Sequence, residues 1–132
     1  MDLSDEELTY VVIGCYRTVY NEWGAGFLES GYVGALVHEF RKRGLNVRRE
    51  VPVPLYYDGV EVAKYRIDLL IENRLLVEVK CCSALRPEHI RQAFNYLRCT
   101  DIEMALLVNF GTKPEVRRFT LRNGEKKHLK RG

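Results

Sequence analysis

The segment RIDLLIENRLLVEVK, from Arg66 to Lys80, constrains the fold more than any other part of the chain. Two apolar runs flank Glu72-Asn73-Arg74, a sequence typical of a tight turn between antiparallel strands. Because side chains alternate between the two faces of a strand, the odd-numbered residues should form one continuous apolar face. These residues are Ile67, Leu69, Ile71, Leu75, Val77 and Val79. The segment therefore predicts a hairpin with one face in a hydrophobic core.

The even-numbered residues of the same hairpin carry its charges. A turn centred on Asn73 places Asp68 opposite Glu78, and Arg66 opposite Lys80, on one face. Like charges directly opposite each other destabilise a sheet, so two facing carboxylates make physical sense when they share a cation. The hairpin therefore predicts a metal site.

The predicted site has the composition that a divalent cation needs. Oxygen ligands from the two carboxylates, joined by the Val79 carbonyl, suit Mg²⁺ or Mn²⁺, which also take substrate phosphate as a ligand. Lys80 would hold or deprotonate the attacking water and offset negative charge that grows on a phosphate. The alternative is a solvent-exposed polar face without metal, although Leu70 and Leu76 on this face indicate partial cover by a helix.

Local signals predict the other elements. A capping box at Ser4 and Glu7, helical apolar spacing and glycines at helix ends predict helices at about residues 4–21, 27–43 and 87–100. Extended patterns predict strands at about residues 47–57, 60–71, 75–80 and 104–110, and leave a last one at 116–121 open. Pro52 and Pro54 place the first strand at a sheet edge. Asp58-Gly59 predicts the turn to the second strand.

The second helix should bury a stripe at helical spacing, which comprises Leu28, Tyr32, Leu36 and Phe40. The helix from Pro87 is long enough to make strand 104–110 parallel to a strand of the meander. The expected fold class is α/β, of the mixed α+β kind, with order ααβββαβ(β) and a mixed central sheet flanked by helices. We expect one domain over residues 1–122 and a basic C-terminal tail over residues 123–132.

Length and composition exclude several classes of protein. The 132 residues suffice for one domain, and no apolar run approaches the ~18 residues that a membrane span needs. The acidic start MDLSDEEL differs from a secretory signal, which predicts a cytoplasmic protein. The four cysteines contain no C-x-x-C pair, so we expect small buried hydrophobes and neither a zinc site nor a redox thiol.

Positive charge is concentrated in two runs, although the net charge is only +3. From Lys113 to Gly132 the net charge is +6, whereas residues 1–112 carry −3. Such clusters suit a polyanion such as nucleic acid, because each neutralised phosphate releases counterions. The alternative is a solvated helix end and a surface tail. The other run comprises Arg41, Lys42, Arg43, Arg48 and Arg49.

Several motifs, in order along the chain, together resemble one known family. The pattern D-x9-E-V-K, from Asp68 to Lys80, resembles the metal site of the PD-(D/E)xK nuclease superfamily. The stretch GFLESGY, from Gly26 to Tyr32, resembles the motif of the GxxExxY protein family within it. Two departures are Ile67, where a proline is usual, and Cys81, where an alanine is common. Further matches are His89, Gln92, Asn95-Tyr96-Leu97 and the LLVNFG of residues 106–111.

The resemblance implies a restriction-endonuclease-like core and a role for each matching residue. Asp68 and Glu78 would bind Mg²⁺ or Mn²⁺, together with Glu29 from the first core helix. Lys80 would be the catalytic lysine, and Gln92 would orient that lysine or a phosphate. Each residue also has a plain structural alternative: Glu29 as a helix surface residue, and Gln92 with Tyr96 as a packing pair.

The function implied is metal-dependent hydrolysis of phosphodiester bonds in nucleic acid, with DNA favoured over RNA by the resemblance alone. The alternative is a binding module that keeps the fold but does not cut, as a subunit of a larger repair or defence complex. A homodimer is a further expectation, because cleavage of both strands by one site requires a partner or repositioning. The residues expected to contact nucleic acid are Arg41, Lys42, Arg43, Arg48, Arg49, Arg66 and Tyr96.

Overall fold

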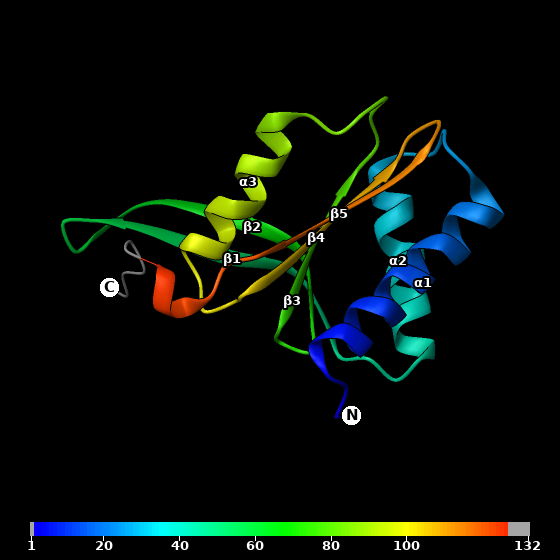
Figure 1. The fold of residues 1–132 in the computed structure, drawn as a ribbon. Coiled ribbons are helices and arrows are strands. Elements are labelled where there is room, and N and C mark those ends of the chain that lie inside the picture. Colours follow the sequence, from blue (N-terminus) through cyan, green and yellow to red (C-terminus); the bar gives the residue numbers. More distant parts are fainter. Residues whose placement is uncertain (1, 127–132) are drawn as a thin grey trace.

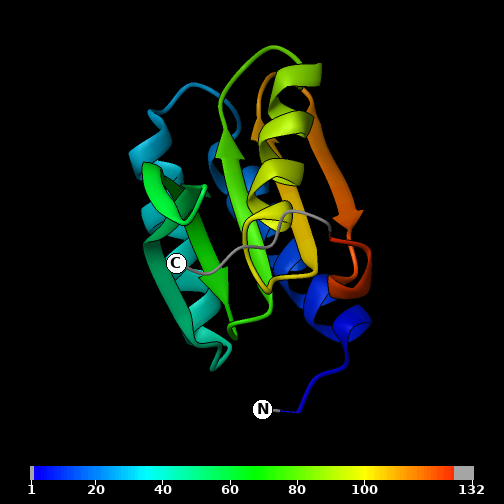
Figure 2. The same ribbon diagram turned by 90° about the vertical axis from the view of Figure 1, so that its left-hand side faces the viewer.

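Five strands form one mixed sheet with helices on both faces in the computed structural model, which describes residues 2–126 (Figure 1). Helices α1 and α2 cover one face and α3 covers the other, as the perpendicular view shows (Figure 2). This architecture confirms the predicted mixed α/β class. In chain order the elements are α1 (Asp5–Trp23), α2 (Glu29–Lys42), β1 (Val47–Tyr57), β2 (Val60–Ile71), β3 (Leu75–Lys80), α3 (Pro87–Arg98), β4 (Met104–Phe110), β5 (Pro114–Thr120) and the 3-10 helix η1 (Asn123–Glu125).

The strand order in the sheet follows the chain, β1-β2-β3-β4-β5. Neighbouring strands are antiparallel except β3 and β4, which are parallel and are joined through α3. The predicted crossover is therefore confirmed. The strand left open at residues 116–121 is present as β5, shifted two residues toward the N-terminus at its start.

Two tight turns set the register of the first three strands. Asp58 and Gly59 have φ values of 53° and 75°, and Glu72 and Asn73 have φ values of 53° and 55°. The first is a two-residue hairpin turn between Tyr57 and Val60, and the second is a three-residue loop between Ile71 and Leu75, closed by the Arg74 N–H, which donates to the Ile71 carbonyl at 3.0 Å. The resulting β2–β3 pairs, Leu69 with Val77 and Ile71 with Leu75, are those of a turn centred on Asn73.

The helices agree with the sequence except at the start of α2. The capping box of α1 is present, since Ser4 and Glu7 each accept from the other's backbone N–H. Helix α2 begins only at Glu29, so Leu28 lies outside the helix and is exposed, and its predicted place in the buried stripe is wrong. The other three residues of that stripe are fully buried.

The core is divided by the sheet into two clusters, one under α1 and α2 and one under α3. Leu69 and Val77 belong to the first cluster, but Ile67 packs in the second with Leu70. The prediction of one continuous odd-numbered face is therefore wrong at Ile67. The regular β2–β3 ladder ends at Leu69, because the next N–H, that of Asp68, donates to a side chain instead.

The start of the predicted tail contacts the rest of the chain. Lys126 Nζ donates to the carbonyls of Thr100 and Ile102, at 2.8 and 2.7 Å, in the connection between α3 and β4. Residues 127–132 of that tail lie outside the described residues. Within the described range, no helix is both long and apolar enough to cross a membrane.

Candidate functional site

Asp68 and Glu78 lie side by side where β2 and β3 separate. The Asp68 N–H donates to Glu78 Oε2 at 2.7 Å, and the Val79 N–H donates to Asp68 Oδ2 at 2.8 Å. Each carboxylate thus reaches across to the backbone of the other strand. The predicted opposition of the two acids is present, whereas the Arg66–Lys80 pair is not, because the ladder ends before it and Arg66 lies 4.0 Å from Glu50.

Burial makes both acids reluctant to ionise. Glu78 is only 2 % exposed, and desolvation followed by the charge of Asp68 raises its pKa to about 8. Desolvation also raises the pKa of Asp68, against the opposing effects of the Val79 N–H and Lys80. Ionisation of both acids would concentrate negative charge in a poorly solvated place, and a bound cation would relieve that cost.

Lys80 is held beside the acids by a chain of polar groups on α3. Its Nζ donates to Gln92 Oε1 at 3.0 Å, and Gln92 lies one helical turn before Tyr96, whose pKa it lowers. Desolvation raises the pKa of Tyr96 to about 12, and Glu78 and Asp68 act in the same direction. Tyr96 therefore stays neutral, and Gln92 holds Lys80 through one hydrogen bond.

The side chain of Glu29 reaches the same region from α2, on the other side of the sheet. The start of α2 and the end of β3 lie at one edge of the molecule (Figure 1). Partial burial raises the pKa of Glu29, the charge of Asp68 raises it further, and Lys80 opposes both effects. All five residues predicted for catalysis, which are Glu29, Asp68, Glu78, Lys80 and Gln92, are thus electrostatically or directly connected.

Tyr32 explains the spacing of the GFLESGY motif. Its hydroxyl donates to the Gly24 carbonyl at 2.5 Å and accepts from the Phe27 N–H at 3.2 Å, and its ring stacks on Phe110 with centroids 4.0 Å apart. These contacts fix the loop that leads into α2 and therefore the position of Glu29. Tyr32 is a core residue, as its helical stripe predicted, and it also positions a site residue.

Two residues at the end of β4 hold the chain just beyond Lys80. Asn109 is fully buried, its Oδ1 accepts from the Cys82 N–H at 3.0 Å and its Nδ2 donates to the Cys82 carbonyl at 2.8 Å. A Cβ on Gly111 would lie 2.2 Å from the same carbonyl, so only glycine fits there. Sequence reasoning assigned these residues no role, although a buried Asn in the apolar run MALLVNF was a usable signal.

Glu50 is a further acidic neighbour that sequence reasoning missed. It lies on β1 between the residues that pair with Leu69 and Ile67, it raises the pKa of Asp68, and its φ of 49° is unusual for a side chain other than glycine. No local pattern marked it, since a glutamate in an exposed strand is ordinary.

The donor set fits a hard divalent cation. The candidate ligands are carboxylates, which suit Mg²⁺ or Mn²⁺, and a bound cation would offset the burial and the neighbouring charge of Asp68 that raise the pKa of Glu78. Among residues 2–126, no three His, Cys, Asp or Glu side chains lie close enough together to hold an ion. Asp68 and Glu78 are therefore the candidate pair, with Glu29 farther away.

The residues expected to contact nucleic acid are dispersed. Residues 41–43 lie at the opposite end of α2 from Glu29, roughly 18 Å along the helix axis, and Lys42 and Arg43 both pair with Glu39. Arg48 and Arg49 are exposed on β1. Tyr96 is only 5 % exposed, so its ring lies in the core, in contrast to the surface role expected for it.

The cysteines and His89 have structural surroundings. All four cysteines are free, and Cys15 alone is fully buried, so the expectation of small buried hydrophobes is wrong for the exposed Cys81. Desolvation and the charge of Glu29 raise the pKa of Cys81, which disfavours a reactive thiolate. His89 Nδ1 accepts from the Arg86 N–H at 3.0 Å at the start of α3.

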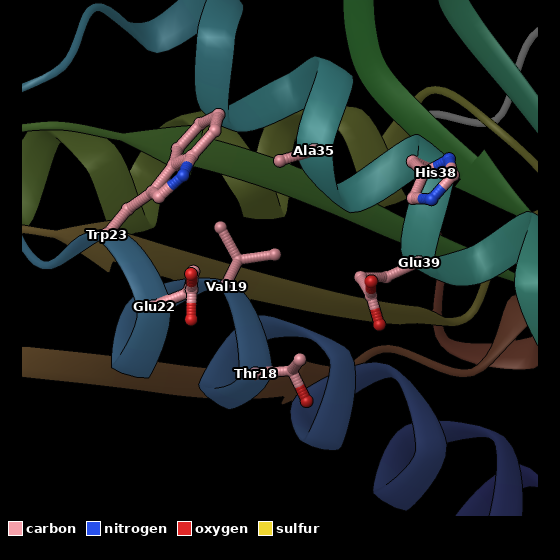
Figure 3. Close-up of a pocket in the computed structure, with 7 residues that line it drawn as sticks. All are labelled: Thr18, Val19, Glu22, Trp23, Ala35, His38 and Glu39. Atoms are coloured by element: carbon pink, nitrogen blue, oxygen red, sulfur yellow. The ribbon is translucent and has the colours of Figure 1, made fainter.

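A hollow of about 430 Å³ between α1 and α2 lies apart from these residues (Figure 3). Glu22 and Trp23 line it from α1, and His38 and Glu39 line it from α2 (Figure 3). None of its lining residues belongs to the predicted site. The residues of the predicted site therefore lie at the end of β3 and not in this hollow.

Comparison with known proteins agrees with this arrangement. Residues 6–119 match the family model described as the PD-(D/E)XK nuclease superfamily. No curated protein matches the sequence significantly.

Two solved structures share the fold at low sequence identity. The crystal structure of SSO0001 is 18% identical, with a TM-score of 0.54 over 92% of this chain and 61% of that one. An alkaline exonuclease (LHK-Exo) from Laribacter hongkongensis is 14% identical, with a TM-score of 0.52 over 94% of this chain and 73% of that one. This chain thus spans less than two thirds of the length of the SSO0001 chain.

Proposed function

The chain belongs to the PD-(D/E)XK nuclease superfamily, and from that membership we propose that it hydrolyses phosphodiester bonds in nucleic acid, with DNA as the first substrate. The observation that carries the proposal is the juxtaposition of Lys80 with Asp68 and Glu78, two acids that share one poorly solvated region. We also propose, from the GFLESGY motif, that the chain is a member of the GxxExxY family within this superfamily.

Asp68 and Glu78 would hold Mg²⁺ or Mn²⁺, with water and phosphate oxygens as the remaining ligands. Such a cation, when bound, polarises a phosphate and lowers the pKa of a water molecule. The positive charge of a bound cation would favour the ionised form of Glu78 at neutral pH. Without the cation, the pKa of Glu78 is about 8. Glu29 would add negative charge at the same edge and help to orient a water molecule.

Lys80 supplies the positive charge that the reaction needs as a phosphate oxygen becomes more negative. The bond from Lys80 Nζ to Gln92 Oε1 fixes the ammonium group before the substrate arrives. A group oriented in advance spends no energy on reorganisation during the reaction. Gln92 and Tyr96 are therefore positioning residues, and Lys80 is the proposed catalytic residue.

The alternative is a nucleic-acid-binding module that does not cut. One observation favours it: both acids already accept backbone hydrogen bonds, and Glu78 stays largely protonated at neutral pH while no cation is bound. The two functions differ in whether Lys80 is needed for turnover or only for binding.

The deciding experiment measures cleavage of supercoiled DNA, single-stranded DNA and RNA in Mg²⁺ or Mn²⁺. We expect Lys80→Ala to lower cleavage by at least ~100-fold with little change in DNA affinity, the scale of losing one preorganised electrostatic group. Arg17→Ala, which removes an exposed charge on α1, is the matched control and should cleave like wild type.

Equal cleavage by wild type and Lys80→Ala, purified in parallel, would refute the assignment of this site. The absence of cleavage by wild type on every substrate, together with retained DNA binding, would favour the binding module.

A further inference from the structure

The hairpin of β1 and β2 extends well beyond the rest of the sheet. The β1–β2 ladder continues to the pair Tyr57 and Val60, whereas β3 pairs with β2 only over residues 69–71. Residues 52–66, which we term the hairpin arm, therefore project past β3 and lie beside α3 (Figure 1). The arm has no strand of the sheet beside β2 over this length in the described part of the chain.

A groove of about 920 Å³ lies between the hairpin arm and the C-terminal half of α3. The arm contributes Tyr57 and Tyr65 to it, and α3 contributes Asn95 and Arg98. Tyr57 is 76 % exposed, and Tyr65 is also exposed. Two exposed aromatic rings that line the same open groove indicate a binding surface.

Side-chain contacts connect one wall of the groove with the proposed catalytic site. The ring of Tyr65 lies against that of Tyr96, with centroids 6.3 Å apart. Tyr96 lies one helical turn after Gln92, which accepts from Lys80 Nζ. A ligand in the groove would therefore end within a few side chains of Lys80.

Positive groups at the groove are available for phosphate. Arg98 is exposed and bonds only weakly to Asn95, at 3.5 Å, and it forms no ion pair with any residue of the described range. Elsewhere on the arm, outside the lining of the groove, Lys64 and Arg66 make only long ion pairs of 3.8 and 4.0 Å with exposed glutamates. Such exposed pairs are weak, and a phosphate would readily compete for both cations.

We propose that this groove binds an unpaired strand of nucleic acid, with bases stacked on Tyr57 and Tyr65 and a phosphate on Arg98, and so directs that strand to the proposed nuclease site. The inference rests on the proposed function and specifies its substrate class. Tyrosine rings stack on the faces of bases that are not paired, which a continuous duplex does not offer. An aromatic groove with a free arginine thus fits a single strand better than a duplex.

The test measures binding of fluorescein-labelled dT12, rU12 and a blunt DNA duplex by anisotropy, in EDTA so that no metal-dependent cleavage occurs. We expect wild type to prefer the single strands, and Tyr57→Ala, Tyr65→Ala and Arg98→Ala each to weaken that binding by about fivefold or more. Comparison of dT12 with rU12 shows whether DNA or RNA is favoured. Tyr65→Phe, which keeps the ring, should bind like wild type.

The matched control is Tyr10→Ala, because Tyr10 is an equally exposed tyrosine, 81 % accessible, on α1 away from the groove. Its affinity for dT12 should equal that of wild type. Thermal melting of each variant verifies folding. Tyr57 is more exposed than Tyr65, so Tyr57→Ala still tests the groove if Tyr65→Ala does not fold.

Unchanged single-strand affinity in all three groove variants would overturn the proposal, as would equal affinity of wild type for strand and duplex. A change in oligomeric mass on Tyr57→Ala, with dT12 affinity unaltered, would instead assign the groove to protein contacts. Failure of the groove is distinguishable from failure of the proposed function, because binding is measured without metal and cleavage is measured through Lys80→Ala.

Discussion

Replacement of Glu78 by glutamine should change how the stability of the metal-free protein depends on pH. The pKa of Glu78 is about 8 in the folded chain, against an ordinary value of 4.5. Between these pH values the folded chain keeps a proton that the unfolded chain releases. The contribution of Glu78 to the free energy of unfolding is therefore fully present below pH 4.5 and is lost as the pH rises from 4.5 to about 8.

The magnitude follows from the two pKa values. Each pKa unit corresponds to about 1.4 kcal/mol, so the difference between the pKa values of 4.5 and about 8 corresponds to about 5 kcal/mol of stability. Glutamine has nearly the same shape, and its Oε1 can accept from the Asp68 N–H as Glu78 Oε2 does. Glu78→Gln should thus be more stable than wild type at pH 8.5, by about 2–5 kcal/mol, and its stability should vary less with pH.

Urea unfolding followed by circular dichroism at pH 5.5 and pH 8.5, in EDTA, measures this effect. Glu22→Gln is the control, because Glu22 is exposed near the end of α1 and forms no ion pair with the described residues. Its pH dependence should match that of wild type. If Glu78→Gln and wild type lose the same stability between the two pH values, the free-energy cost assigned to ionising Glu78 is wrong.

Three further expectations concern the cation, the GFLESGY loop and the basic run. Millimolar Mg²⁺ or Mn²⁺ at pH 8 should raise the Tm of wild type but not of Glu78→Gln, because a ligand bound only by the folded chain stabilises it; thermal melts with and without EDTA check this, and an unshifted wild type would contradict it. Tyr32→Phe removes two hydrogen bonds of the loop before Glu29, so it should lose about 1–3 kcal/mol of stability in urea unfolding. It should also cleave DNA more slowly than wild type at unchanged DNA affinity. A cleavage rate equal to that of wild type would exclude a positioning role for Tyr32. Charge reversal at residues 41–43 should flatten the dependence of DNA affinity on salt, by about 0.9 in logarithmic slope for each phosphate that the run no longer neutralises; anisotropy at several salt concentrations measures it, and identical slopes would remove this run from the interface.

The sequence by itself determined the elements and the register of the central hairpin. The turn at Glu72-Asn73 and the alternation of side chains on either side depend on neighbours in the chain, which a sequence displays directly. The opposition of Asp68 and Glu78 followed from these local rules and is present in the structure.

Only the tertiary structure decided how the rest of the site is assembled. The bond from Lys80 to Gln92 joins a strand to a helix, and the approach of Glu29 to Asp68 crosses from one face of the sheet to the other. Such contacts depend on the packing angles of whole elements, which alternation and capping rules do not specify.

Packing also overrode local patterns at particular positions. Ile67 packs on the face under α3 and not on the face that the alternation of side chains predicted. The Asp68 N–H donates to the Glu78 side chain, which interrupts the regular β2–β3 ladder next to Ile67. Tyr96 was expected to contact nucleic acid, but its side chain is buried in the cluster between α3 and the sheet. The sequence determines which residues have the right chemistry, and the packing of elements distant in the chain decides which of them meet.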